Sequence, residues 1–433
     1  MRIRNVDAFQ IFDSRGNPTV EAVVTLDSGV RGQGLVPSGA STGRSEALEL
    51  RDGVPDRFRG RSVFRAIENV RGEIAGALVG RDVTDQAAID RRLIELDGTP
   101  NKSRLGANAI LGVSMAAVRA AAAAQGKSLF DHLGNGLGTL LPLPEIQLFG
   151  GGKHANGRVD VQDFMIVATG ATTYEQSLEM TFNVFQAGGE LLKERGVLAG
   201  VADEGGYWPA FDRNEAVLDA MVEAIVRAGY EPGRQVAISL DIAASDLYRD
   251  GHYRFGLEGK TFSSAGFAEL LASWMDKYPI ISIEDPMAEE DWEGWALARK
   301  LFGHRVQLIG DDLFTTNLDR IRKGIELGVA NAVLIKLNQI GTVTETLEAI
   351  RATQRAGWLP IISARSGETE DAFIAHLAVA TDAGQIKVGS FCRSERMSKW
   401  NELLRIQREL GARAQFPGSP IYERILTSPN VSI

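Results

Sequence analysis

The fold is decided by one stretch of the chain, residues 306–336, which reads VQLIGDDLFTTNLDRIRKGIELGVANAVLIK. It begins with the largely apolar run VQLIG, which Asp311 follows at once, and it ends with the run AVLI, which Lys336 follows. Short apolar runs of this kind are typical of buried strands. About 25 residues separate the two strand ends, which fits one strand, one helix and two loops. The stretch therefore predicts one βα unit of a parallel sheet.

The same rhythm continues on both sides of this stretch. Other short apolar runs end on a charged or polar side chain: Asp241, Glu284, Ser363 and Lys387. Repeated steps of about 25 residues predict a (β/α)8-type barrel, in which the carboxyl ends of the strands converge on the active site. Structural salt bridges at the barrel rim are the alternative for any one of these residues. Three acids and two lysines in the same register favour a functional site.

The first 130 residues follow a different pattern, which predicts a smaller α+β domain before the barrel of residues 131–433. Alternation and helical periodicity predict three strands and three helices, over 3–12, 19–26, 32–36, 63–78, 86–96 and 107–124. The apolar stretch 107–124 contains Asn108, Ser114 and Arg119, so we predict a buried helix rather than a membrane span. Asn108 and Arg119 are interpreted as polar helix residues without a functional role.

The composition is that of a soluble globular protein. The chain has 433 residues, of which 44% are apolar and 24% charged, and its net charge is −9. This balance argues against an electrostatic nucleic-acid or membrane partner. The single cysteine, Cys392, excludes a disulfide framework within the chain and fits a reducing cytoplasm. The N-terminal sequence lacks the apolar core of a signal peptide.

The three acids at the strand ends, Asp241, Glu284 and Asp311, predict a metal site. Carboxylates buried together repel one another, and a divalent cation removes that repulsion. A set of oxygen ligands without histidine or cysteine favours Mg²⁺ over Zn²⁺. Beside such a cation, the pKa of Lys336 is expected to fall, which makes a neutral amine base. The predicted chemistry is proton abstraction next to a metal-bound carboxylate.

Several longer motifs resemble those of the enolase family, and the resemblance covers nearly the whole chain. They are DSRGNPTVE (13–21), VPSGASTG (36–43), GANAILGVS (106–114), DEGG (203–206), SIEDP (282–286), GDDL (310–313), IKLNQIG (335–341), RSGETED (365–371) and RSER (393–396). The resemblance implies an α+β cap on a barrel with an irregular ββαα start. It also implies a homodimer or a higher assembly of dimers.

The resemblance implies two Mg²⁺ sites, a base and an acid. Asp241, Glu284 and Asp311 match the ligands of the first ion, and Ser38 matches a ligand of the second through a mobile lid. Lys336 matches the base that removes the C2 proton of 2-phosphoglycerate, and Glu204 matches the acid that assists departure of the 3-hydroxyl. Further residues match contacts to a small phosphorylated carboxylate: Arg365 and Ser366 at its phosphate, Lys387 at its carboxylate, and His154 as an active-site histidine. Ala364 and Asp163 stand at substrate-binding positions of the family pattern without matching its residues.

Three departures from the family pattern concentrate near the expected pocket. Ala364 replaces the histidine of SHRSGETED, Asp163 replaces the glutamate of QEF, and Trp208 stands in the segment that reads GDEGGFAP in the family. Loss of one hydrogen bond to a charged group costs roughly 1.5–3 kcal/mol. Asp163 is expected to be about an ångström too short for the usual contact. Trp208 is expected to add an aromatic wall to the pocket.

These departures predict a specialised paralogue in phosphonate or phosphinate natural-product (antibiotic) biosynthesis. It would be similar to carboxyphosphonoenolpyruvate synthase, with transferase chemistry and a phosphonoformate donor as second substrate. Two alternatives remain open. One is an ordinary enolase, a lyase that converts 2-phosphoglycerate to phosphoenolpyruvate. The other is a non-catalytic binding protein on the same scaffold, against which the intact Lys336 and Glu204 argue.

Overall fold

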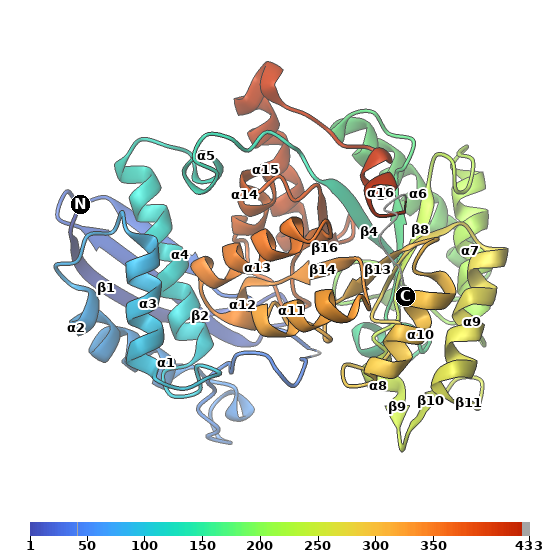
Figure 1. The fold of residues 1–433 in the computed structure, drawn as a ribbon, viewed down its shortest axis with the longest axis horizontal. Helices are drawn as coiled ribbons and strands as arrows, with labels where there is room; N and C mark the ends of the chain where they lie inside the picture. The colour runs from blue at the N-terminus through green and yellow to red at the C-terminus, as the bar shows by residue number, and fades with distance from the viewer. Residues whose placement is uncertain (41, 427–433) are drawn as a thin grey trace.

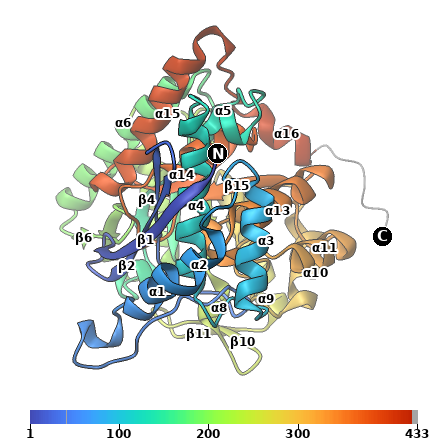
Figure 2. The same ribbon diagram turned by 90° about the vertical axis from the view of Figure 1, so that its left-hand side faces the viewer.

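The computed structural model describes residues 1–40 and 42–426. Ser41 of the VPSGASTG motif and residues 427–433 of the expected barrel domain lie outside the described residues. The chain forms an N-terminal α+β unit that packs against one side of a larger barrel (Figure 1). Turned by 90°, the N-terminal unit faces the viewer and covers much of the barrel (Figure 2).

The N-terminal unit contains an antiparallel sheet in the order β1-β2-β3, covered by helices. Its elements are β1 (Ile3–Phe12), β2 (Pro18–Leu26), β3 (Arg31–Leu35), a 3-10 turn (Phe58–Gly60), α1 (Phe64–Asn69), α2 (Ala75–Leu78), α3 (Gln86–Asp97), α4 (Ala107–Ala124) and α5 (Leu129–Leu133). The strand predictions are confirmed to within one residue, and two of the three helices likewise. The predicted helix 63–78 is interrupted by a π-helical segment, Val70–Ile74.

Helix α4 packs directly on β2 and β3 because small residues let the backbones approach closely. A Cβ atom on Gly32 would lie 2.1 Å from the carbonyl oxygen of Ala116, and one on Gly34 would lie 2.4 Å from that of Gly112. By length and hydropathy α4 alone among the described helices could cross a membrane, but 83% of it is buried inside the protein. The prediction of a buried helix over 107–124 is confirmed.

The larger unit is a closed barrel in the strand order β4-β5-β8-β12-β13-β14-β15-β16, with β16 pairing back to β4. The strands are β4 (Leu143–Gly150), β5 (Asp163–Val167), β8 (Ala237–Asp241), β12 (Ile280–Glu284), β13 (Gln307–Gly310), β14 (Ala332–Ile335), β15 (Leu359–Ser363) and β16 (Gln385–Gly389). Strand β5 is antiparallel to both neighbours, and the other neighbouring strands are parallel. The predicted α/β barrel with its ββαα start is confirmed.

Helices cover the outside of the barrel, and short hairpins extend from it (Figure 1). The helical elements are a 3-10 turn (Gly152–Ala155), α6 (Tyr174–Glu194), α7 (Asn214–Arg227), α8 (Ala244–Leu247), α9 (Ser264–Lys277), α10 (Trp292–Phe302), α11 (Leu318–Leu327), α12 (Leu337–Ile340), α13 (Val343–Arg355), α14 (Phe373–Ala380), α15 (Ser394–Leu410), a 3-10 turn (Gly411–Arg413) and α16 (Pro420–Leu426). The hairpin strands are β6 (Leu198–Val201), β7 (Tyr207–Pro209), β9 (Tyr248–Arg249), β10 (His252–Phe255) and β11 (Lys260–Phe262).

Helix α7 begins without a side-chain cap. The N-cap is Arg213, and it makes no side-chain cap hydrogen bond. Glu215, in the first turn of α7, accepts a hydrogen bond from Nε1 of Trp274 at 3.0 Å. Trp274 lies on α9, so this hydrogen bond joins two neighbouring helices.

Candidate active site

Two of the three acids at the strand ends, Asp241 and Glu284, lie against the amine of Lys387. Asp241 ends β8, and Glu284 ends the adjacent β12, directly opposite Asp241 in the parallel register. Lys387 lies inside β16, and its Nζ is 2.8 Å from Asp241 Oδ2 and 2.9 Å from Glu284 Oε2. Burial lowers the pKa of Lys387, but Asp241 and Glu284 outweigh it and raise that pKa well above its usual value. Lys387 is therefore a buried cation that lies between Asp241 and Glu284.

Lys336 and Asp311 form the neighbouring ion pair. Each residue directly follows its strand, and Lys336 Nζ lies 2.5 Å from Asp311 Oδ2. Burial lowers the pKa of Lys336, but the charge of Asp311 outweighs it and raises the pKa. The sequence predicts that a nearby cation lowers the pKa of Lys336. This pKa is raised instead, because Lys336 faces the negative charge of Asp311. Gln339 donates to the other oxygen of Asp311 at 2.8 Å.

The carboxylates in this region fit a divalent cation. Glu284 Oε1 is buried and has no hydrogen-bond partner among the described residues. Burial and the nearby Asp241 raise the pKa of Glu284 well above its usual value. Oxygens of Asp285, Asp311 and Asp312 also lie within 4.8 Å of one another. Such crowded, oxygen-only ligands suit Mg²⁺, which would occupy them in place of protons.

Three side chains form a row beside the pocket: Asp163, His154 and Glu204, of which the last two line it. His154, in the 3-10 turn after β4, lies with Nδ1 2.9 Å from Asp163 Oδ1 and Nε2 3.9 Å from Glu204 Oε1. Burial lowers the pKa of His154, but Asp163 and Glu204 outweigh it and raise that pKa to about 9. His154, which lies between Asp163 and Glu204, is thus a cation at neutral pH.

The side chain of Asp163 contacts other side chains of the site although it is one methylene shorter than glutamate. It sits on β5, accepts a hydrogen bond from Gln147, contacts His154, and lies 3.5 Å from Lys387 Nζ. Burial raises the pKa of Asp163, but His154 outweighs it and holds the pKa below its usual range. The missing methylene therefore does not isolate Asp163 from the acid side of the pocket.

Arg365 and Ser366 lie on the loop after β15, and α15 holds that loop in place. Arg396 on α15 is fully buried and donates to the carbonyl oxygens of Arg365 and Ser366, each at 2.7 Å. The Lys399 amine lies 2.9 Å from Glu368 of the same loop. Two buried cations from one helix therefore fix the backbone that presents the expected phosphate contacts.

One pocket brings most of the predicted residues together. Its lining includes His154, Glu204, Asp241, Asp311, Lys336, Ala364, Arg365, Ser366 and Lys387. Asp163 and Glu284 are buried next to that lining rather than part of it. Ser38 is also outside the lining, and its hydroxyl donates to Glu49 at 3.0 Å.

The interpretation of Trp208 needs correction. Trp208 is not a wall of the pocket: it lies on β7, opposite Gly200 of the hairpin partner β6. Arg119 is a polar residue of helix α4, and its guanidinium makes a two-point ion pair with Asp371 of the RSGETED segment. Asn108 likewise exchanges two buried hydrogen bonds with the backbone of Leu50.

Sequence reasoning also missed residues that complete the site. Asp285 and Asp312 line the pocket. Each directly follows a predicted metal ligand, in SIEDP or GDDL, so its place in the sequence could have identified it as a site residue. Gln162 donates to Asp241 at 3.1 Å, and its position directly before Asp163 is a weaker sequence signal for a site residue. Glu46 contacts Arg365 from the N-terminal unit, and nothing in its local sequence pointed to that contact.

Comparison with known proteins identifies the same two units. The family model "Enolase, N-terminal domain" matches residues 3–133, and "Enolase, C-terminal TIM barrel domain" matches residues 138–425. Enolase 1 of Desulfitobacterium hafniense (strain Y51) is 54% identical over 424 residues, covering 97% of each chain. These matches imply Mg²⁺ as cofactor, consistent with the acids described above.

These matches correct the expectation of a specialised paralogue. Identity of 54% over 97% of both chains to a protein named Enolase 1 favours an ordinary enolase over a carboxyphosphonoenolpyruvate synthase. Transferase chemistry, a phosphonoformate donor and a role in phosphonate or antibiotic biosynthesis have no support. The replacement at Asp163 keeps a contact with His154, which lies 2.9 Å away. The chain is an Mg²⁺-dependent lyase that belongs to the enolase family.

Proposed function

We propose that the protein is an ordinary enolase, which catalyses the reversible dehydration of 2-phosphoglycerate to phosphoenolpyruvate. The similarity to Enolase 1 over the whole chain carries this proposal. The geometry supports it, because Lys336 and Glu204 line one pocket as a candidate base and a candidate acid. Elimination of water needs one group to take a proton and another to give one.

In this proposal Lys336 removes the C2 proton, and Glu204 protonates the departing 3-hydroxyl. Mg²⁺, held by Asp241, Glu284 and Asp311, would supply positive charge that stabilises the substrate carboxylate as it gains negative charge. Lys336 must lose its own proton before it acts, and its ion pair with Asp311 opposes that loss. Binding of Mg²⁺ to Asp311 would weaken the attraction between Asp311 and the Lys336 ammonium, and so favour loss of that proton.

The remaining residues bind and orient the substrate. Arg365 and Ser366 would hold the phosphate, because a guanidinium and a hydroxyl donate hydrogen bonds to its oxygens. Lys387 would neutralise the substrate carboxylate. His154, as a cation beside Glu204, would stabilise the charge that Glu204 acquires when it gives up its proton.

Two assays test the proposal. With Mg²⁺ present, 2-phosphoglycerate should give a steady rise in the ultraviolet absorbance of phosphoenolpyruvate, and chelation should abolish it. Product analysis by mass spectrometry should show phosphoenolpyruvate alone. No turnover, together with no calorimetric binding of Mg²⁺ or 2-phosphoglycerate, would favour the non-catalytic alternative.

Three further expectations remain proposals: the oligomeric state, the domain boundary and the location of the protein in the cell. Family membership supports a dimer or a higher oligomer, which light scattering would measure. The division at residue 130 stays a prediction, with the family matches ending and restarting at 133 and 138. A cytoplasmic location also stays a prediction from the single cysteine.

A further inference from the structure

We propose that Glu46, from the N-terminal unit, is a positioning residue that sets the orientation of Arg365 in the active site. Glu46 lies between β3 and the 3-10 turn Phe58–Gly60, on the segment that begins with the VPSGASTG motif. Its side chain is 8% exposed, and that of Arg365 is 3% exposed. The contact between them therefore joins two parts of the fold inside the protein. This inference rests on the proposed function.

The contact is a two-point ion pair. Glu46 Oε2 lies 3.0 Å from Arg365 Nη1, and Glu46 Oε1 accepts from Arg365 Nη2 at 3.3 Å. Asn338 also accepts from Arg365 Nη1, at 2.8 Å. A fork of this kind fixes the plane of a guanidinium as well as its position. Arg365 can then meet a phosphate without first losing rotational freedom.

Glu46 also connects Arg365 to the metal side of the pocket. Gln339 Nε2 donates to Glu46 Oε1 at 3.4 Å and to Asp311 Oδ1 at 2.8 Å. The backbone N–H of Gly43 donates to Glu46 Oε1 at 3.0 Å, which holds the turn of the same segment. One carboxylate thus ties the segment, the phosphate contact and the Asp311 network together.

Glu46 acts through Arg365 rather than on the substrate. Arg365 lines both the active-site pocket and the adjacent cavity beneath residues 36–49, whereas Glu46 lines only that adjacent cavity. The carboxylate therefore contacts the guanidinium without lining the active-site pocket itself. Removal of a buried charge partner leaves the other charge uncompensated and free to reorient.

The test is Glu46→Gln, which keeps the shape of the side chain and removes its charge. Calorimetry with inorganic phosphate in Mg²⁺ buffer would report the phosphate contact independently of turnover. We expect phosphate binding to weaken about tenfold, and KM for 2-phosphoglycerate to rise more than kcat falls. In a protein that carries Arg365→Lys, Glu46→Gln should weaken phosphate binding much less, because lysine cannot form a two-point ion pair with Glu46.

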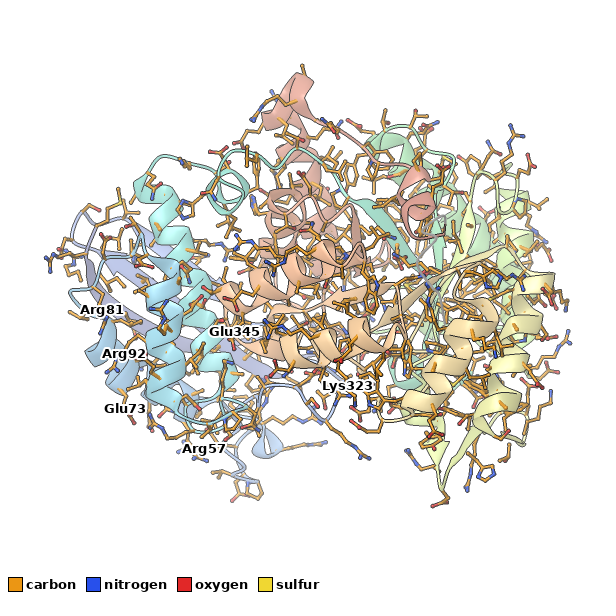
Figure 3. All side chains as sticks on the ribbon, in the orientation of Figure 1. Arg57, Glu73, Arg81, Arg92, Lys323 and Glu345 are labelled. Atoms are coloured by element: carbon orange, nitrogen blue, oxygen red, sulfur yellow. The ribbon has the colours of Figure 1, made fainter. Side chains whose placement is uncertain are left out.

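Glu345→Gln is the matched control. Glu345 pairs with Lys102 at 3.0 Å across the same boundary, and Figure 3 labels it between the N-terminal helices and α13. It should lower thermal stability without changing phosphate binding. Equal losses of phosphate affinity in both variants, or an undiminished Glu46→Gln effect in the Arg365→Lys background, would overturn the proposal. Absence of turnover in the unmodified protein, with phosphate affinity still dependent on Glu46, would reject the proposed function alone.

Discussion

Lys336 Nζ lies 2.5 Å from Asp311 Oδ2, so the proposed base and a proposed metal ligand share one ion pair. Replacement of Lys336 by Met should therefore separate catalysis from metal binding. We expect kcat to fall by about a thousandfold or more, because Lys336 is the proposed base for the C2 proton and methionine cannot accept a proton. Mg²⁺ binding, measured by calorimetry, should persist or tighten because the competing ammonium is gone.

The informative control is Lys323→Met, which removes an amine from helix α11. That amine lies 3.8 Å from the centre of the Trp292 ring, outside the active-site pocket. It should leave kcat unchanged. More than a tenth of the original kcat in the Lys336 variant would show that another group is the base.

Glu284→Gln should have opposite effects on metal binding and on metal-free stability. Loss of one ligand charge should weaken Mg²⁺ binding by at least about tenfold. In chelator, the same variant should unfold at a higher temperature, because burial and Asp241 make the ionised Glu284 unfavourable. Calorimetry and thermal unfolding measure the two effects, and unchanged Mg²⁺ affinity would remove Glu284 from the metal site.

The sequence was sufficient to predict the barrel and the residues at its strand ends. Lys336 and Asp311 could be placed because the carboxyl ends of successive parallel strands must converge. The contact of Glu46 with Arg365 could not, because it depends on how the N-terminal unit packs against the barrel. The ion pair of Arg119 with Asp371 could not be predicted for the same reason, since the two residues lie 252 positions apart in the sequence.

Inference from single replacements failed where a neighbour could compensate. Asp163 seemed too short, yet His154 reaches it at 2.9 Å. Trp208 was assigned to the pocket from its distance in sequence to Glu204, but the β6–β7 hairpin carries it away from the lining. Side-chain length and sequence proximity do not fix a three-dimensional contact.

His154 should make stability fall at alkaline pH. Its pKa is about 9 in the folded protein against an ordinary value of 6.5. A raised pKa means that the protonated form stabilises the fold, fully below about pH 6.5, and that this contribution disappears as pH rises through about 9. The contribution is about 3 kcal/mol at its largest. Denaturant unfolding of the metal-free protein from pH 6 to 10 should show it.

His154→Gln should remove most of this pH dependence while keeping a hydrogen-bonding side chain. The comparison isolates His154, because Asp163 and Glu204 remain in both proteins. Parallel stability curves for the two proteins between pH 6 and 10 would contradict the assignment of a cation at this position.

Ala364→His should raise kcat/KM for 2-phosphoglycerate. Ala364 lines the pocket with Arg365 and is 5% exposed, so an imidazole there would face the substrate. A hydrogen bond to a charged group contributes roughly 1.5–3 kcal/mol, which corresponds to a gain of about ten- to a hundredfold if it forms in the transition state. Ala364→Leu adds volume without a donor and should lower the rate. Steady-state kinetics of both variants test this prediction. No gain in kcat/KM with histidine would contradict it, and would indicate that the His154–Asp163 pair already supplies the hydrogen bond of the missing imidazole. An equal gain with leucine would show that packing, rather than a hydrogen bond, raises the rate.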